Sequence, residues 1–115
     1  MGHAKMKLQK IEKELLEKFF SKRGIEKDYI NKLHVVSREH TGSGEYVYLD
    51  GPPHEKLREF DEANFISDEA LYFQIGDNSY SCLFWEEKNK VSFLEIFCNG
   101  YEDYPHDPQD YIMRD

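Results

Sequence analysis

The N-terminal part of the chain has apolar side chains at the three- and four-residue spacing of an amphipathic helix. Gly24 suits the left-handed position just past the end of such a helix, and Lys22 and Arg23 fall in its last turn. A second, shorter helix is predicted around residues 26–33. The apolar stripe of the first helix consists of Leu8, Ile11, Leu15, Leu16, Phe19 and Phe20.

Beyond the second helix, short β-branched and aromatic segments alternate with polar turns, which is typical of strands. Residues 34–39 and 46–50 flank a polar, glycine-containing loop, and this arrangement predicts a hairpin. The later linkers are short, whereas a parallel crossover needs about a dozen residues, so the last strands should form an antiparallel meander. The three segments of this meander are residues 70–76, 79–86 and 91–98.

These elements predict one α+β domain over residues 1–115, in which an N-terminal helix and a short second helix pack on an antiparallel sheet of about five strands. Residues 54–69 fit either one or two helical turns or an acidic surface crossing. The acidic, aromatic tail at residues 99–115 is expected to pack on the sheet. Residues 1–5 are expected to be disordered or to derive from cloning.

Both faces of the predicted meander are apolar, although helices can cover only one face of a small sheet. Tyr46 and Tyr48 share one face of their strand, and Leu83 and Trp85 share one face of theirs. The uncovered face must be closed by the tail, by a partner or around a pocket. The first expectation is that the tail covers this face.

Both cysteines lie within predicted strands and are expected to be reduced and buried. If the hairpin pairs Glu86 with Val91, Cys82 lies opposite Glu95. Cys82 and Cys98 would then point to opposite faces of the sheet, which forbids a disulfide. A register change of one residue would place both thiols on one face, though still not opposite each other.

The net charge of −8 is distributed unevenly along the chain. Residues 1–35 carry +4, whereas residues 36–115 carry −12. Because this acidic part should repel phosphates and anionic lipids, neither nucleic acid nor membrane is expected as a partner. No apolar run reaches ten residues, which excludes a transmembrane helix, and the N-terminus lacks an apolar secretory segment. A cytoplasmic location is therefore expected.

Catalytic and metal-binding patterns are not apparent in the sequence. The five histidines lack H-x-x-x-H, H-E-x-x-H and Cys/His spacing, so no metal and no cofactor are expected. The loop at residues 41–44 matches no nucleotide-binding fingerprint and is interpreted as a hairpin turn. Glu95 is the one candidate acid or base, because a carboxylate between Phe93 and Phe97 must be paired, hydrogen-bonded or neutralised. A satisfied structural carboxylate is the alternative.

The last predicted strand and its surroundings resemble a known group of sequences. Residues 94–97, Leu-Glu-Ile-Phe, are followed by Gly100 and Pro105, and residues 41–44 read Thr-Gly-Ser-Gly. With the N-terminal helix, this order resembles small uncharacterised bacterial α+β proteins that end in an L-E-x-aromatic strand, a polar stretch and a proline. Tyr104 stands where that group has tryptophan. The resemblance implies the fold and carries no activity.

These observations favour a non-enzymatic acidic protein that masks a basic protein partner, as immunity proteins and antitoxins do. One alternative is a small-molecule-binding or minor enzymatic domain, with Glu95 as acid or base in an aromatic-lined pocket. A further alternative is a homodimer formed through the sheet face. The residues expected to bind are Tyr46, Tyr48, Trp85, Glu86, Tyr101, Glu102, Asp103 and Tyr104.

Overall fold

Two helical elements open the fold, in a computed structural model that describes residues 6–114. Helix α1 (Lys10–Arg23) begins where the Gln9 backbone N–H donates to the Glu12 carboxylate at 2.7 Å. It ends at Gly24, whose φ of 71° is the left-handed conformation expected there. The predicted second helix is present as the 3-10 helix η1 (Lys27–Lys32).

Within residues 6–114, six strands form one antiparallel sheet in the order β1-β2-β5-β4-β3-β6. The predicted hairpin and meander are both present, and the tail adds β6 beside β3 as one further edge strand. The α+β prediction is therefore confirmed. The strands are β1 (His34–His40), β2 (Gly44–Asp50), β3 (Leu71–Ile75), β4 (Asn78–Glu87), β5 (Lys90–Cys98) and β6 (Ile112–Arg114).

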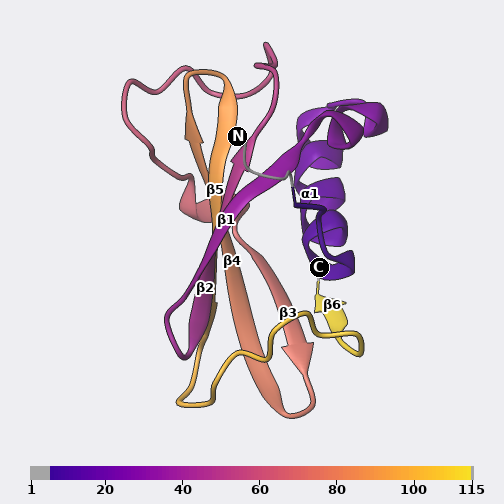
Figure 1. The fold of residues 1–115 in the computed structure, drawn as a ribbon, viewed down its shortest axis with the longest axis vertical. Helices are drawn as coiled ribbons and strands as arrows, with labels where there is room; N and C mark the ends of the chain where they lie inside the picture. Colours follow the sequence, from indigo (N-terminus) through magenta and orange to yellow (C-terminus); the bar gives the residue numbers. More distant parts are fainter. Residues whose placement is uncertain (1–5, 115) are drawn as a thin grey trace.

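The core lies between α1 and one face of the sheet (Figure 1). The predicted stripe faces this core, because Ile11, Leu15, Leu16, Phe19 and Phe20 are all buried, and Leu8 packs at its margin. Phe19 stacks on Phe84 of β4 with ring centroids 4.2 Å apart. Burial of each such side chain contributes roughly 1.5–3 kcal/mol, so this contact anchors the helix to the sheet.

A β-bulge changes the predicted register of the last hairpin. Glu86 does pair with Val91, but Trp85 pairs with Phe93, so the strand containing Ser92 has one extra residue there. The expectation that the two thiols point to opposite faces is therefore wrong. The partner of Cys82 is Ile96 and that of Cys98 is Tyr80, which places both cysteines on the helix side. Both are buried and free, as predicted.

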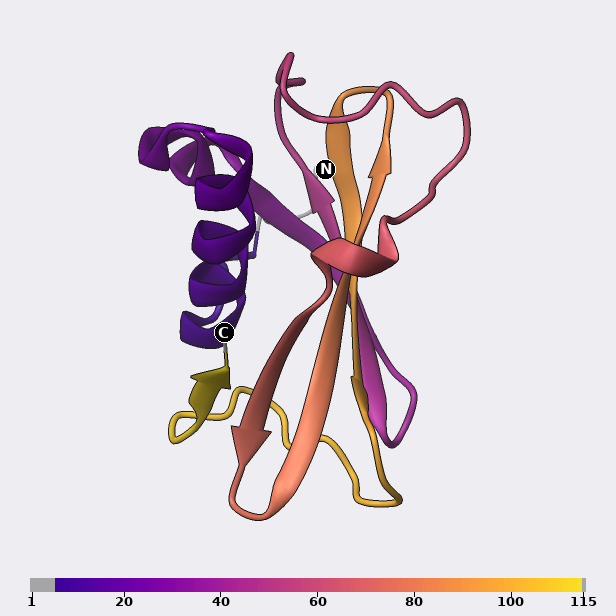
Figure 2. The ribbon, with the colours of Figure 1, turned by 180° about the vertical axis from the view of Figure 1, so that it is seen from behind.

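The tail passes beneath the end of the sheet and returns to the side of α1 (Figures 1 and 2). Tyr104 packs edge-on against Tyr80 at 5.6 Å and is 3% exposed. Its backbone N–H donates to the Gly42 carbonyl at 3.0 Å, and the Tyr80 hydroxyl donates to the Asp103 carbonyl at 2.9 Å. The prediction of Tyr104 as a binding residue is corrected, because its ring belongs to the core.

Residues 51–70 form an irregular segment that contains only the short 3-10 helix η2 (Ser67–Glu69) and a turn. It curves over the opposite end of the sheet from the tail (Figure 2). Asn64 forms an isolated bridge with Glu86, with backbone hydrogen bonds of 3.0 and 2.7 Å. The segment therefore adds a bridge beside the end of β4 and brings Phe65 against Trp85.

Candidate functional site

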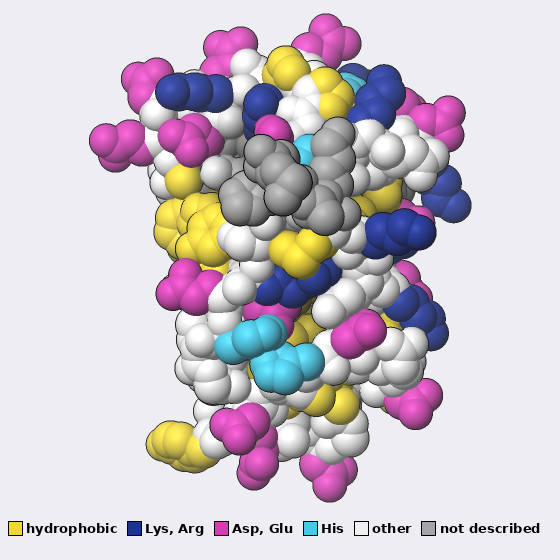
Figure 3. Space-filling view, viewed as in Figure 1, with side chains coloured by type: hydrophobic (Ala, Val, Ile, Leu, Met, Phe, Trp, Pro, Cys, Tyr) yellow, Lys and Arg dark blue, Asp and Glu magenta, His cyan; other side chains and the backbone are white. Residues whose placement is uncertain are grey.

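Five aromatic side chains form a continuous strip on the sheet face opposite α1, here named the aromatic strip. Phe93 is stacked on Trp85 at 5.2 Å and lies 5.5 Å from Tyr48 and 5.9 Å from Tyr46, and Trp85 lies 4.6 Å from Phe65. All five are half-buried, so each ring keeps part of its surface in solvent. Figure 3 shows apolar side chains gathered on the side away from α1, next to acidic ones.

Strand alternation explains why these rings meet. Tyr46 and Tyr48 alternate with the buried Val47 and Leu49 along β2. Cross-strand pairing then places Tyr48 opposite Phe93, which is within direct packing distance. The strip is thus a consequence of the period-2 pattern of three adjacent strands, with a ring from the preceding loop at one end.

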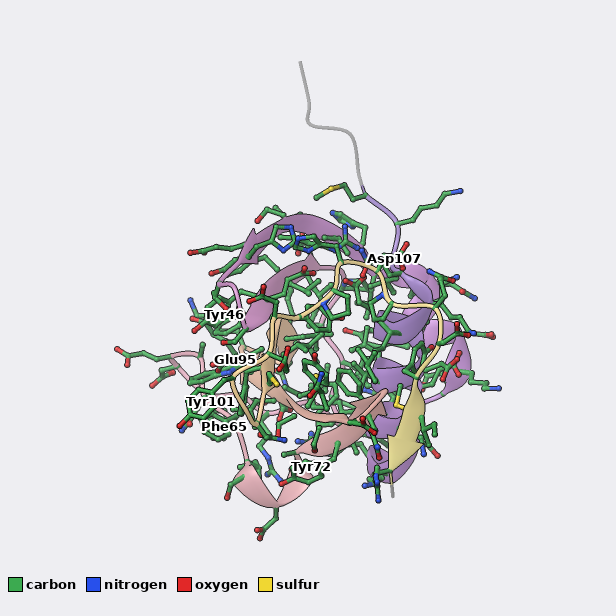
Figure 4. All side chains as sticks on the ribbon, turned by 90° about the horizontal axis from the view of Figure 1, so that it is seen from below. Tyr46, Phe65, Tyr72, Glu95, Tyr101 and Asp107 are labelled. Carbon is green, nitrogen blue, oxygen red and sulfur yellow. The ribbon has the colours of Figure 1, made fainter. Side chains whose placement is uncertain are left out.

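Glu95 stands in the middle of this face, because its cross-strand partners are Tyr46 on β2 and Leu83 on β4. The indole N–H of Trp85 donates to Glu95 Oε1 at 3.0 Å, and the Tyr46 hydroxyl donates to Oε2 at 3.4 Å. The charge of Glu95 is the main cause that raises the pKa of Tyr46. Figure 4 shows Tyr46, Phe65 and Glu95 together on the side away from the helix.

Further carboxylates border the strip. The Tyr48 hydroxyl donates to Glu39 at 3.3 Å, and burial followed by the charge of Glu39 raises the pKa of Tyr48. The Ser92 hydroxyl donates to Glu87 at 3.4 Å. A half-exposed carboxylate with aromatic faces beside it is an arrangement that binds a guanidinium or ammonium group, by hydrogen bond and by cation–π attraction together.

The structure brings together three of the predicted binding residues, Tyr46, Tyr48 and Trp85, and places Glu95 among them. Sequence reasoning missed Phe65, because it lies in the segment whose conformation was open. Its only signal was an aromatic residue next to the start of a predicted meander.

The other three predicted binding residues that are exposed, Tyr101, Glu102 and Asp103, lie in the tail and apart from the strip in sequence. Tyr101 is fully exposed, and Glu102 and Asp103 are exposed as well. In the view from below, Tyr101 lies on the same side of the sheet as Glu95 (Figure 4). These residues are therefore accessible to a partner, although no contact connects them to the strip.

The prediction of Glu86 as an acidic surface residue is wrong. Its side chain continues the alternation of Tyr80, Cys82 and Phe84 along β4 and points to the helix side, where it is 0% exposed. There Arg23, the last residue of α1, donates to both of its oxygens at 2.9 and 2.6 Å. Glu86 therefore joins helix to sheet and cannot contact a partner.

One group of possible metal ligands also comes together in the described residues. His40, Glu45 and His106 place donor atoms close to one another, although the sequence lacks any local metal-binding spacing. Pairing of His40 with Glu45 could be inferred from the predicted hairpin. The arrival of His106, 61 residues beyond Glu45, had no signal in the sequence because it depends on the path of the tail.

Comparisons with known proteins identify no family for this chain. No family model matches it, and neither a curated protein nor a solved structure gives a significant match. The resemblance to small bacterial α+β proteins therefore stays a prediction. Within residues 6–114, no helix is both long enough and apolar enough to span a membrane.

Proposed function

We propose that this protein is a binding domain whose aromatic strip takes up a basic segment of a protein partner. The observation that carries the proposal is the position of Glu95, half-exposed at the centre of five packed aromatic rings. An arginine or lysine side chain that reaches Glu95 would lie against the rings of Trp85 and Phe93. It would then gain a charge-assisted hydrogen bond and cation–π attraction at one place.

The strip is suited to be covered by a partner. The chain's own helix and buried tail residue pack on the other side of the sheet, so half-buried rings remain in contact with water. Tryptophan and tyrosine dominate the energetics of protein interfaces. The bond from Trp85 to Glu95 and the stacking on Phe93 hold these side chains in place before binding, which reduces the entropy lost on association.

Charge supports a basic partner. Residues 36–115, which include every ring of the strip, carry −12, and such a field accelerates encounter with a positively charged surface. The same charge disfavours the homodimer hypothesis. Two copies related by a twofold axis through this face would bring like carboxylates together, Glu95 and Glu39 of one copy facing those of the other.

The enzymatic hypothesis has less support in the geometry. Glu95 is fixed by two donors on an outer surface, and its neighbours are rings from three strands and a loop. A general acid or base acts best in an enclosed, water-poor site beside the reacting group. The binding hypothesis agrees with the features of this face, which are exposed aromatic area, stacked rings and a fixed negative charge.

The test uses Trp85, the only tryptophan of the chain, as a fluorescent reporter. An arginine-rich peptide is titrated beside a peptide of identical length in which citrulline replaces each arginine. We expect only the charged peptide to change Trp85 emission and to shift amide NMR signals along β2, β5 and β4. Equal binding of the two peptides, or shifts confined to other elements, would contradict the proposal.

A matched pair of variants tests the role of Glu95. Glu95→Gln should weaken binding of the charged peptide at least about tenfold, because a hydrogen bond to a charged group contributes roughly 1.5–3 kcal/mol. Asp68→Asn removes the same charge from an exposed position in η2 and should change the affinity by less than about threefold. If both variants weaken binding equally, overall charge and not the strip is responsible.

A further inference from the structure

His40, Glu45 and His106 meet at the end of the β1–β2 hairpin, where the tail crosses it. His40 Nδ1 lies 2.7 Å from Glu45 Oε2, and His106 Nδ1 lies 3.6 Å from the same oxygen. The three donor atoms all lie within 4.8 Å of one another. The two imidazole rings are 3.7 Å apart between centroids, and Figure 3 shows histidine side chains side by side on the surface.

Glu45 is an unusual carboxylate, because it is 1% exposed and neither of its oxygens has a hydrogen-bond partner. The contact with His40 lacks the alignment of a hydrogen bond. Arg38 Nε is 3.6 Å from Oε1, too far for a bond, and donates instead to Glu12 at 2.9 Å. A buried carboxylate without donors is strongly disfavoured unless a cation or a proton compensates it.

The local charges leave this compensation incomplete. Arg38 supplies one positive charge between two buried carboxylates, Glu12 and Glu45, so one negative charge remains. Asp107 adds negative charge near Arg38. A cation in contact with Glu45 would relieve this imbalance.

We propose that His40, Glu45 and His106 bind a divalent transition-metal ion, with Zn²⁺ as the ion that fits best. Two imidazole nitrogens and one carboxylate oxygen form a donor set that zinc favours, whereas magnesium and calcium prefer oxygen alone. Tetrahedral zinc with bonds of about 2.0–2.1 Å separates neighbouring donor atoms by about 3.3 Å. The observed separations of 2.7 and 3.6 Å lie on either side of that value, so small side-chain shifts would admit the ion.

The arrangement leaves a coordination position toward solvent. The side chains of His40 and His106 are 48% and 63% exposed, whereas Glu45 closes the site from below. Three protein ligands with an open fourth position is the composition that lets zinc hold a water molecule. The bound ion would also join the tail to the hairpin, beside the existing bond from Tyr104 to Gly42.

This site is independent of the proposed partner-binding function. Glu45 and Tyr46 are neighbours on β2 and therefore point to opposite faces of the sheet. In the view from below, Asp107 lies toward α1 and well apart from the labelled residues of the strip (Figure 4). Failure of the zinc proposal would leave the basic-peptide test unaffected, and the reverse holds as well.

The experiment is a calorimetric titration of Zn²⁺ into the full chain at pH 7.5, with His3 replaced by alanine in every protein so that the terminal imidazole does not contribute. We expect one equivalent to bind with a micromolar or lower dissociation constant. His40→Ala and His106→Ala should each weaken binding at least tenfold. Because both side chains are exposed, these variants keep the core intact.

Two controls separate this site from unspecific binding. His34→Ala removes another histidine from the same strand and should leave the affinity unchanged. X-ray absorption of the zinc complex should show nitrogen and oxygen ligands without sulfur, and imidazole ¹⁵N spectra should assign the shifted nitrogens to His40 and His106. Absence of binding at 100 µM zinc, sulfur ligation, or equal loss in the His34 variant would overturn the proposal.

Discussion

Two clusters, each centred on one arginine between two carboxylates, connect α1 to the rest of the fold at opposite ends of the helix. At the C-terminal end, Arg23 donates four hydrogen bonds that satisfy Glu69 and Glu86 together. At the N-terminal end, Arg38 gives both of its carboxylate bonds to Glu12, and Glu45 receives none.

The difference follows from where each arginine stands. Arg23 reaches both carboxylates from the end of the helix, and the Arg58 backbone N–H completes the set around Glu86 at 3.0 Å. Arg38 lies on β1, and its guanidinium points toward Glu12 on the helix. The second carboxylate, Glu45 on β2, therefore has the histidines as its nearest neighbours. A closed cluster of this kind holds the fold together, whereas an open one has capacity for a ligand.

The largest expected effect comes from Arg23→Ala. It leaves the fully buried Glu86 without its cation and Glu69 with only the more distant Arg58, so the free energy of unfolding should fall by about 3–5 kcal/mol. Urea denaturation measures this loss. Arg58→Ala is the control, because the side chain of Arg58 is 46% exposed and its removal should change stability by less than about 1 kcal/mol. A loss of similar size in both variants would mean that the cluster is not closed around Arg23.

The next effect compares one carboxylate from each cluster. Glu86→Gln should destabilise the protein by roughly 1–3 kcal/mol, because it weakens bonds from Arg23 and from the Arg58 backbone. Glu45→Gln should leave the stability unchanged or raise it by up to about 1 kcal/mol in zinc-free buffer at pH 8, because it removes a buried charge without donors. Thermal or urea denaturation of the two variants measures the contrast. Equal destabilisation would show that Glu45 is satisfied.

The smallest effect is the pH dependence of the closed cluster. Burial opposes ionisation of Glu69, but hydrogen bonds and the charge of Arg23 outweigh it and lower the pKa of Glu69 below its ordinary 4.5. A lowered folded-state pKa stabilises the fold above 4.5, and this contribution disappears as the pH falls through the lowered value. We expect Glu69→Gln to flatten the loss of stability between pH 5 and 3 by up to about 1 kcal/mol, as urea denaturation at several pH values can measure. An unchanged slope would exclude Glu69 from the acid response.

Local patterns predicted the elements well. The three- and four-residue spacing of apolar residues from Leu8 to Phe20 predicted α1, and Gly24 marked its end. Short turns predicted an antiparallel sheet, which the pairing of β3, β4 and β5 confirms. These signals depend on residues close together in the sequence, so they can be recognised without the tertiary structure.

The wrong predictions concern side-chain directions that depend on strand register, which one inserted residue can change for a whole strand. A single extra residue at Ser92 reversed the faces that the residues of β5 were expected to share with those of β4. Strand periodicity carries no sign of such a bulge, because the direction of each side chain depends on the register of the partner strand. The burial of Tyr104 was also missed, because it depends on the path that the tail takes and not on a local pattern of residues.

By itself the sequence determined the class of fold, the amphipathic helix and the alternation that collects aromatic rings on one face of β2. Only the tertiary structure decided which carboxylates are satisfied. Ion pairs between α1 and the sheet, and the approach of His106 to Glu45, join residues that are far apart along the chain. Such contacts depend on distances of a few ångströms set by packing and register, and no short-range pattern of residues encodes them.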